Sequence, residues 1–211
     1  MKNWHNRRQL KCEKYAFLFD KAPDEDLICF DCETSHLNPK NAEILSIGAV
    51  KIKNNMILTS QRLELFIKPR CKIDETSIKI HHLRHCDLEN GLQVEDAILC
   101  FLDFIGSRPL VGYYLEFDVA MVNKYLNPLL GIRLPNEQIE VSGLYYDYKQ
   151  NVFNPVPINL RFDAILKDLD LPAFGQHDAL NDALMTAMMY IKLRNCCTGR
   201  GSARGSEQPV V

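Results

Sequence analysis

Two carboxylates that stand two positions apart, Asp31 and Glu33, follow the apolar run 27–30. If this run is a strand, side chains at positions i and i+2 point to the same side of the sheet. Holding two such charges together costs free energy through desolvation and repulsion, and a hard cation such as Mg²⁺ or Mn²⁺ offsets that cost. The pair therefore predicts a cation site, although a solvated pair in a loop would have the same local sequence.

A third carboxylate, Asp118, stands at the beginning of a helix that the apolar spacing predicts over 117–130. Met121 and Val122 follow three and four positions later, so Asp118 shares the side of the helix that faces the core. The first turn of a helix also stabilises an anion by itself. Asp118 is thus either a further cation ligand or a helix-stabilising aspartate.

His177 and Asp182 flank the start of another predicted helix, over 179–194. Five positions on a helix correspond to roughly 140° of rotation, so both side chains reach one cleft only if His177 lies on the loop before the helix. Asp178 suits the N-cap of that helix. Histidine changes its charge near neutral pH and serves as a base in many enzymes, whereas an isolated surface histidine is the alternative.

The predicted elements that carry these residues change along the chain from strands to mostly helices. Three strands with short connections, which favour an antiparallel meander, are predicted over 27–33, 43–52 and 57–67. One short strand (109–113) and four helices follow, the helices over 94–105, 117–130, 159–168 and 179–194, whereas 131–157 has no clear pattern. This order predicts an α/β fold whose mixed sheet is flanked by helices.

The length of 211 residues suits one domain with a full hydrophobic core. We expect this domain to span 25–195, after a basic helical extension over 1–24 and before a tail, 196–211, whose Gly/Ser/Arg-rich composition predicts disorder. An amphipathic helix over 3–19 would either pack on the domain or contact nucleic acid or a partner. The net charge of -2 argues against holding a polyanion through a global positive field.

The eight cysteines are expected to be reduced thiols. The N-terminal residues lack the apolar region of a secretory signal, and no segment is long and apolar enough to span a membrane, so we expect a cytoplasmic protein without a membrane contact. Cys29 and Cys32 form a C-x-x-C, but three positions apart on a strand their side chains point to opposite faces. They are predicted to be core residues and not a zinc or redox pair.

These polar residues occur together as Asp-x-Glu-Thr at a strand end, Phe-Asp at the start of a middle helix and His-(four residues)-Asp at a late helix. In this the chain resembles the DEDDh, or DnaQ-like, 3′–5′ exonucleases, a family with a ribonuclease H-like fold that includes the proofreading epsilon subunit of bacterial DNA polymerase III. The resemblance implies that two Mg²⁺ or Mn²⁺ ions are held at the scissile phosphate by Asp31, Glu33, Asp118 and Asp182. It also implies that His177 acts as the general base on the attacking water.

The same resemblance implies contacts to the substrate. The backbone of Thr34 would meet the 3′ end, Leu37 would wedge beside the terminal base, and Phe117 would pack on the terminal nucleotide. His81, in the segment Ile-His-His-Leu, resembles a family segment near the site and is either a substrate contact or a packing residue.

The chain departs from the family pattern in two places. His36 stands where a glycine is usual, and the segment Tyr114-Leu115-Glu116 lacks the asparagine that commonly precedes Phe-Asp. Both departures bear on the substrate preference more than on the metal chemistry.

The resemblance predicts hydrolysis of phosphodiester bonds from a free 3′ end, with release of nucleoside 5′-monophosphates. Single-stranded or frayed DNA is the expected substrate, with RNA close behind, and a DNA polymerase is a candidate partner. The alternative is a catalytically silent nucleic-acid-binding or polymerase-accessory module on the same fold, which would not need a histidine base. A glycosidase needs only two carboxylates, together with an aromatic cleft for the sugar. The single tryptophan of this chain does not suggest such a cleft.

Overall fold

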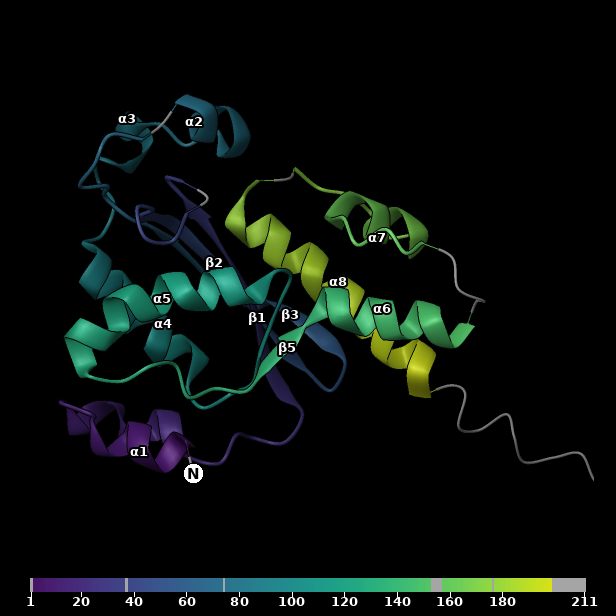
Figure 1. Ribbon diagram of the computed structural model, residues 1–211, viewed down its shortest axis with the longest axis horizontal. Coiled ribbons are helices and arrows are strands. Elements are labelled where there is room, and N and C mark those ends of the chain that lie inside the picture. The colour runs from purple at the N-terminus through teal and green to yellow at the C-terminus, as the bar shows by residue number, and fades with distance from the viewer. Residues whose placement is uncertain (1, 37, 74, 153–156, 176, 199–211) are drawn as a thin grey trace, which may run out of the picture.

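A five-stranded sheet runs through the middle of the computed structural model, which describes residues 2–36, 38–73, 75–152, 157–175 and 177–198 (Figure 1). The strand order is β3-β2-β1-β4-β5. The bounds are β1 Asp26–Thr34, β2 Ile44–Lys53, β3 Met56–Phe66, β4 Leu110–Gly112 and β5 Gln138–Glu140. The first three strands pair antiparallel, whereas β4 pairs parallel with both β1 and β5. The predicted meander within a mixed sheet is confirmed.

Helices cover both faces of this sheet (Figure 1). One layer contains α4 (Val94–Ile105) and α5 (Leu115–Leu130), and the other contains α6 (Val141–Val152), α7 (Phe162–Asp168) and α8 (Ala179–Thr198). Alternate side chains of β1 enter opposite layers: Ile28 and Phe30 pack with α4 and α5, and Leu27 and Cys29 pack with α8. The same alternation turns Asp31 and Glu33 toward α8.

The two cysteines of the C-x-x-C motif are buried in different layers. Cys29 packs in the α8 layer and Cys32 in the α4–α5 layer, so the predicted core positions are confirmed. Every cysteine whose side chain the structure describes is a free thiol. Within the described ranges, none of the helices has the length and apolar character to cross a lipid bilayer.

The N-terminal segment forms two short helices, so the prediction of one helix over 3–19 is wrong. The α-helix α1 (Lys2–Arg8) and the 3₁₀ helix η1 (Glu13–Phe19) are separated by a break. In this break the Lys11 N–H donates to the Leu130 carbonyl (2.9 Å), and Lys11 Nζ donates to the Pro128 carbonyl (2.9 Å). These long-range bonds replace the local ones that a continuous helix would need. α1 lies at the end of the sheet where β1 begins (Figure 1).

Several elements were not predicted. They are β5 and α6, in the stretch without a clear pattern, and α2 (Glu75–His81) and α3 (His85–Leu88), which stand at the end of the sheet where β1 ends (Figure 1). The helix expected over 159–168 begins only at Phe162. Asn159 Oδ1 accepts the Arg161 N–H (3.1 Å), a local turn that competes with the helix.

Candidate active site

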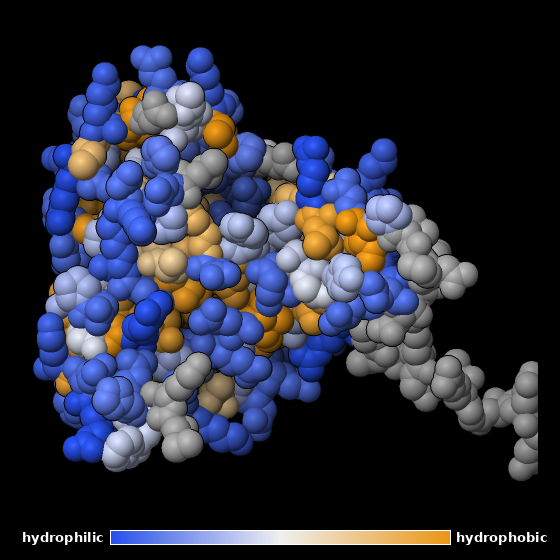
Figure 2. Space-filling model, viewed as in Figure 1, coloured by the Kyte–Doolittle hydropathy of each residue, from blue (hydrophilic) through white to orange (hydrophobic). Residues whose placement is uncertain are grey.

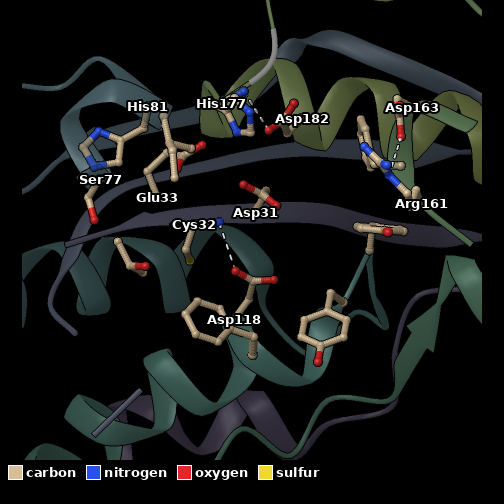
Figure 3. A pocket seen from close by; sticks show the side chains of 16 residues that line it. Asp31, Cys32, Glu33, Ser77, His81, Asp118, Arg161, Asp163, His177 and Asp182 are labelled. Atoms are coloured by element: carbon tan, nitrogen blue, oxygen red, sulfur yellow. Dashed lines mark hydrogen bonds and ion pairs between the residues drawn. The ribbon is translucent and has the colours of Figure 1, made fainter. Parts of the chain in front are cut away.

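A cleft of about 590 Å³ opens where β1 ends. Figure 2 shows the surface hollowed between α2 and α7, with hydrophilic residues at the bottom of the hollow. The cleft is lined by all five residues that were expected to carry the chemistry: Asp31, Glu33, Asp118, His177 and Asp182. In Figure 3 their side chains, which come from β1, α5 and the start of α8, point toward a common space.

Asp31 and Glu33 occupy the carboxyl end of β1. The register with β2 shifts between Glu33 and Thr34, which marks a bulge. Bulges bend a strand and re-aim its side chains, and they are frequent beside active sites. Asp31 is partly buried and Glu33 is only 9% exposed, so the strand end presents two poorly hydrated carboxylates to the cleft.

Asp118 lies in the first turn of α5 and is buried. Its Oδ1 accepts a hydrogen bond from the backbone N–H of Cys32 (3.2 Å), the residue between Asp31 and Glu33. This bond ties the carboxylate of α5 to the strand that carries the other two. Because a helix N-terminus favours an anion, Asp118 stabilises α5 and supplies charge to the cleft at the same time.

The start of α8 carries the last two residues of the set. Asp178 Oδ1 accepts the Asn181 N–H (2.9 Å), which is the N-cap interaction that the sequence predicted. His177 lies on the loop before the helix, also as predicted, with a left-handed backbone (φ 64). Its N–H donates to Asp182 Oδ2 (3.1 Å), so the loop and the first turn of α8 hold each other in place.

Gly48 allows α8 to approach the strands this closely. It pairs with Asp31 across β1 and β2. A Cβ at this position would overlap backbone atoms of Ala179 and Leu180 in the first turn of α8. The absence of a side chain at Gly48 therefore permits the contact that brings Asp182 beside Asp31.

Burial and mutual repulsion raise the pKa values of four carboxyl groups in the cleft, those of Asp31, Glu33, Asp118 and Asp182. Burial, followed by the charges of Asp118 and Glu33, holds the pKa of Asp31 well above its usual range. Burial has the same effect on the pKa of Asp118. The pKa of Glu33 rises to about 7 through burial and the charge of Asp182, and burial raises the pKa of Asp182 to about 6. Such a concentration of negative charge favours the binding of a cation.

The donor atoms also suit a divalent cation. Glu33, His177 and Asp182 each offer one ligand atom, and these three atoms lie within 4.8 Å of one another. Within the described part of the chain, Asp182 Oδ1 is buried and has no hydrogen-bond partner, an arrangement that costs free energy unless a ligand satisfies the oxygen. Carboxylate oxygens of this kind are the ligands that Mg²⁺ and Mn²⁺ prefer.

Three of the predicted substrate contacts, Thr34, His81 and Phe117, line the same cleft, and Leu37 lies outside the described residues. His81 is buried, and its Nδ1 accepts the Leu83 N–H (3.1 Å), which places the ring proton on Nε2. Among the described residues this Nε2 has no hydrogen-bond partner. Burial lowers the pKa of His81, so a neutral ring presents one N–H to the cleft.

Other residues of the cleft were not predicted to belong to a site. Ser77 in α2 lies beside His81, and its Oγ donates to the Ser35 carbonyl (2.9 Å). A further wall is formed by Tyr113, Tyr114, Arg161, Phe162 and Asp163. The departure from the family pattern at Tyr114 was the one signal in the sequence that pointed to this wall.

Comparisons with known proteins show the family of the chain. A family model described as Exonuclease matches residues 28–190. The chain belongs to this exonuclease family. It is 29% identical to the DNA polymerase III PolC-type of Caldanaerobacter subterraneus over 172 residues, which are 80% of this chain but 11% of that protein. It is 24% identical to the DNA polymerase III subunit epsilon of Aquifex aeolicus over 174 residues, 82% of this chain and 83% of that subunit. The chain thus spans only a small part of the PolC-type relatives.

Solved structures show the same fold. Escherichia coli Exonuclease I in complex with a dT13 oligonucleotide superposes with a TM-score of 0.71 at 12% identity, covering 84% of this chain and 43% of that one. Exonuclease X in complex with 5′ overhanging duplex DNA superposes with a TM-score of 0.61 at 22% identity, covering 80% of this chain and 91% of that one. The predicted ribonuclease H-like fold is confirmed.

Proposed function

We propose that this protein is a metal-dependent 3′–5′ exonuclease that releases nucleoside 5′-monophosphates from the 3′ ends of single-stranded or frayed nucleic acid. The observation that carries the proposal is the meeting of four carboxylates and one histidine, from distant parts of the chain, in one cleft. Membership of the exonuclease family supports the class of reaction. Bound cations would also explain how a chain with a net charge of -2 holds a polyanion.

In this proposal Asp31, Glu33, Asp118 and Asp182 hold two divalent cations, which when bound activate water and stabilise the leaving 3′-oxygen. The protein holds the carboxylates in place before the substrate arrives, because the N–H of Cys32 fixes Asp118 and the N–H of His177 fixes Asp182. The exposed ring of His177 stands beside Glu33 and Asp182, where it can take a proton from the attacking water and pass it to solvent.

The terminal nucleotide is expected to lie on the side of the carboxylates where Thr34 and His81 line the cleft. The Nε2–H of His81, which has no hydrogen-bond partner in the described part of the chain, would donate to an oxygen of this nucleotide and so recover the free energy lost by its burial. Phe117 would supply an apolar surface for the nucleotide. A DNA polymerase as partner stays a prediction, drawn from the names of the relatives.

The proposal is tested with a 5′-labelled single-stranded oligonucleotide and Mn²⁺, with and without a chelator, and with a circular strand of the same sequence. We expect a ladder that shortens from the 3′ end, that disappears with chelator, and that the circular strand does not produce. Matched DNA and RNA strands determine the preferred sugar. A shift in gel mobility without cleavage would instead support the silent binding module, and cleavage in the presence of chelator would contradict the metal mechanism.

The stability of the metal-free protein should fall as the pH rises from about 5 to about 7.5. The folded-state pKa values of Glu33 (about 7) and Asp182 (about 6) exceed the ordinary values of 4.5 and 3.8. The folded state therefore binds more protons than the unfolded state in this window, and the free energy of unfolding decreases with pH by about 4 kcal/mol. Saturating Mn²⁺ should restore the thermal midpoint at the higher pH and change it little at the lower pH. Differential scanning calorimetry measures both effects.

The matched control for this prediction is the Glu33→Gln/Asp182→Asn double variant, whose thermal midpoint should depend much less on pH and on Mn²⁺. A metal-free wild-type protein that is as stable at the higher pH as at the lower one would show that the cleft does not hold uncompensated charge.

A further inference from the structure

One wall of the cleft consists of residues to which the proposed chemistry gives no role: Tyr113, Tyr114, Arg161, Phe162 and Asp163. In Figure 3, Arg161 and Asp163 lie on one side of the carboxylates, whereas Ser77 and His81 lie on the opposite side. If the terminal nucleotide occupies the His81 side, the strand that continues in the 5′ direction passes the wall with Arg161.

Tyr114 is held on this wall in a costly conformation. Its backbone is left-handed (φ 57), which is uncommon for an aromatic residue, and the residue is 73% exposed. Glu140 maintains this conformation, because its carboxylate accepts the N–H of Tyr114 (3.1 Å) and the N–H of Leu115 (2.8 Å). Ser142 in turn donates its Oγ–H to Glu140 (2.7 Å). A strained backbone that keeps a large ring exposed beside a cleft indicates a functional constraint.

Arg161 belongs to a segment that is anchored to the same turn. The Tyr113 hydroxyl donates to the Leu160 carbonyl (2.8 Å), and the Tyr113 ring packs edge-on against Phe162 with a centroid distance of 5.0 Å. Arg161 Nε lies 3.4 Å from Asp163 Oδ1, and the Arg161 side chain is 79% exposed. Asp163 therefore orients the guanidinium while most of its N–H groups stay available to an anion.

The charge of this wall differs from that of the rest of the cleft. Among the described residues that line the cleft, Arg161 is the one with a permanent positive charge. A guanidinium matches two oxygens of a phosphate, and an exposed aromatic ring stacks on any nucleobase. The two groups together suit one nucleotide of a single strand, whatever its base.

We propose that Tyr114 and Arg161 form a subsite for the nucleotide on the 5′ side of the scissile phosphate. The Tyr114 ring stacks on the base of this nucleotide, and the Arg161 guanidinium binds its 5′-phosphate. The inference rests on the proposed function, because the direction of the strand is taken from the position of the carboxylates. The rate of hydrolysis then depends on two groups of the substrate outside the bond that is cut, namely the base and the 5′-phosphate of this nucleotide.

The test uses single-stranded oligothymidylates that differ in one group. One oligonucleotide has a neutral methylphosphonate as the second linkage from its 3′ end. The other lacks the base of its next-to-last nucleotide. For the wild-type protein with Mn²⁺, each change should lower kcat/KM about tenfold. Arg161→Gln should lose its sensitivity to the neutral linkage but keep its sensitivity to the missing base. Tyr114→Asn should show the reverse pattern.

The choice of variants separates substrate binding from folding. Asparagine tolerates the left-handed backbone, so Tyr114→Asn should keep the thermal midpoint of the wild-type protein. Arg161→Lys should recover part of the sensitivity to the neutral linkage, because it restores the charge but not the fork of donors. The matched control Arg8→Gln changes an exposed arginine on α1, at the opposite end of the sheet, and should behave as wild type.

The proposed subsite is contradicted by the following pair of results. The neutral linkage lowers kcat/KM equally for Arg161→Gln and the wild-type protein, and the missing base lowers it equally for Tyr114→Asn and the wild-type protein. Binding of the same strands with Ca²⁺, measured by isothermal titration calorimetry, gives the same comparison without cleavage. A wild-type protein that shows both sensitivities in binding but cuts no strand would count against the proposed function and leave the subsite supported.

Discussion

The Asp182→Asn protein is expected to lose at least about a thousandfold in kcat on a single-stranded oligonucleotide with Mn²⁺, because a carboxylate that holds a cation at the reacting phosphate contributes several kcal/mol to the transition state. The same substitution should raise the thermal midpoint of the metal-free protein near pH 8. The buried Oδ1 of Asp182 has no partner among the described residues, and an amide removes one of the crowded negative charges. The protein would thus gain stability where it loses activity.

Asp178→Asn is the matched control, since it makes the same chemical change four positions earlier on the same segment. Asparagine is as good an N-cap as aspartate, so the bond to the Asn181 N–H and the start of α8 should survive. We expect its activity to stay within a few-fold of wild type. If both variants were equally inactive, the effect would belong to the start of α8 as a whole, and a specific role of the Asp182 carboxylate would be contradicted. Quenched-flow or gel-based single-turnover rates distinguish these outcomes.

The long elements could be predicted because their periods extend over many positions. β1, β2 and β3 have nine to eleven residues each, and α4 shows its apolar stripe along its full length. By contrast, β5 has three residues and α3 has four, too few for any period to appear. β5 is a strand because the edge of β4 accepts it, which is a property of the folded sheet and not of the three residues.

The site divides in the same way. The carboxylates and His177 stand next to the ends of predictable elements, and the resemblance to the DEDDh family implied that they meet in one cleft. The wall with Tyr114 and Arg161 could not be predicted in this way. The hydrogen bond from Tyr113 to the Leu160 carbonyl joins two segments that are far apart in the sequence. The local sequence of neither segment predicts this contact. Local patterns thus predict polar residues at the ends of regular elements better than they predict the residues that line the rest of the cleft.

Gly48 is a position whose importance only the structure reveals. We expect Gly48→Ala to lower the stability of the protein more than an added methyl group at any other position of this sheet would. The new Cβ would overlap the backbone of Ala179 and Leu180. Backbone atoms cannot move aside as the end of a side chain can, so the first turn of α8 must shift away from β2. We expect a loss of about 3 kcal/mol in the free energy of unfolding, near the upper end of the usual cost of overpacking. Urea denaturation followed by circular dichroism measures it.

The activity of Gly48→Ala should fall further than its stability would suggest, because the shift of α8 carries Asp182 away from Asp31, the residue that pairs with Gly48. A displacement of about 1 Å at a catalytic group is enough to cost a hundredfold in rate. Gly143→Ala in α6 is the control, since a Cβ there has free space, with Glu140 Cγ 4.0 Å away, and alanine favours a helix. That variant should be at least as stable and as active as wild type. If Gly48→Ala matched it in both measurements, α8 would not rest on β2 as the structure has it, and the cluster of carboxylates would lose the contact that assembles it.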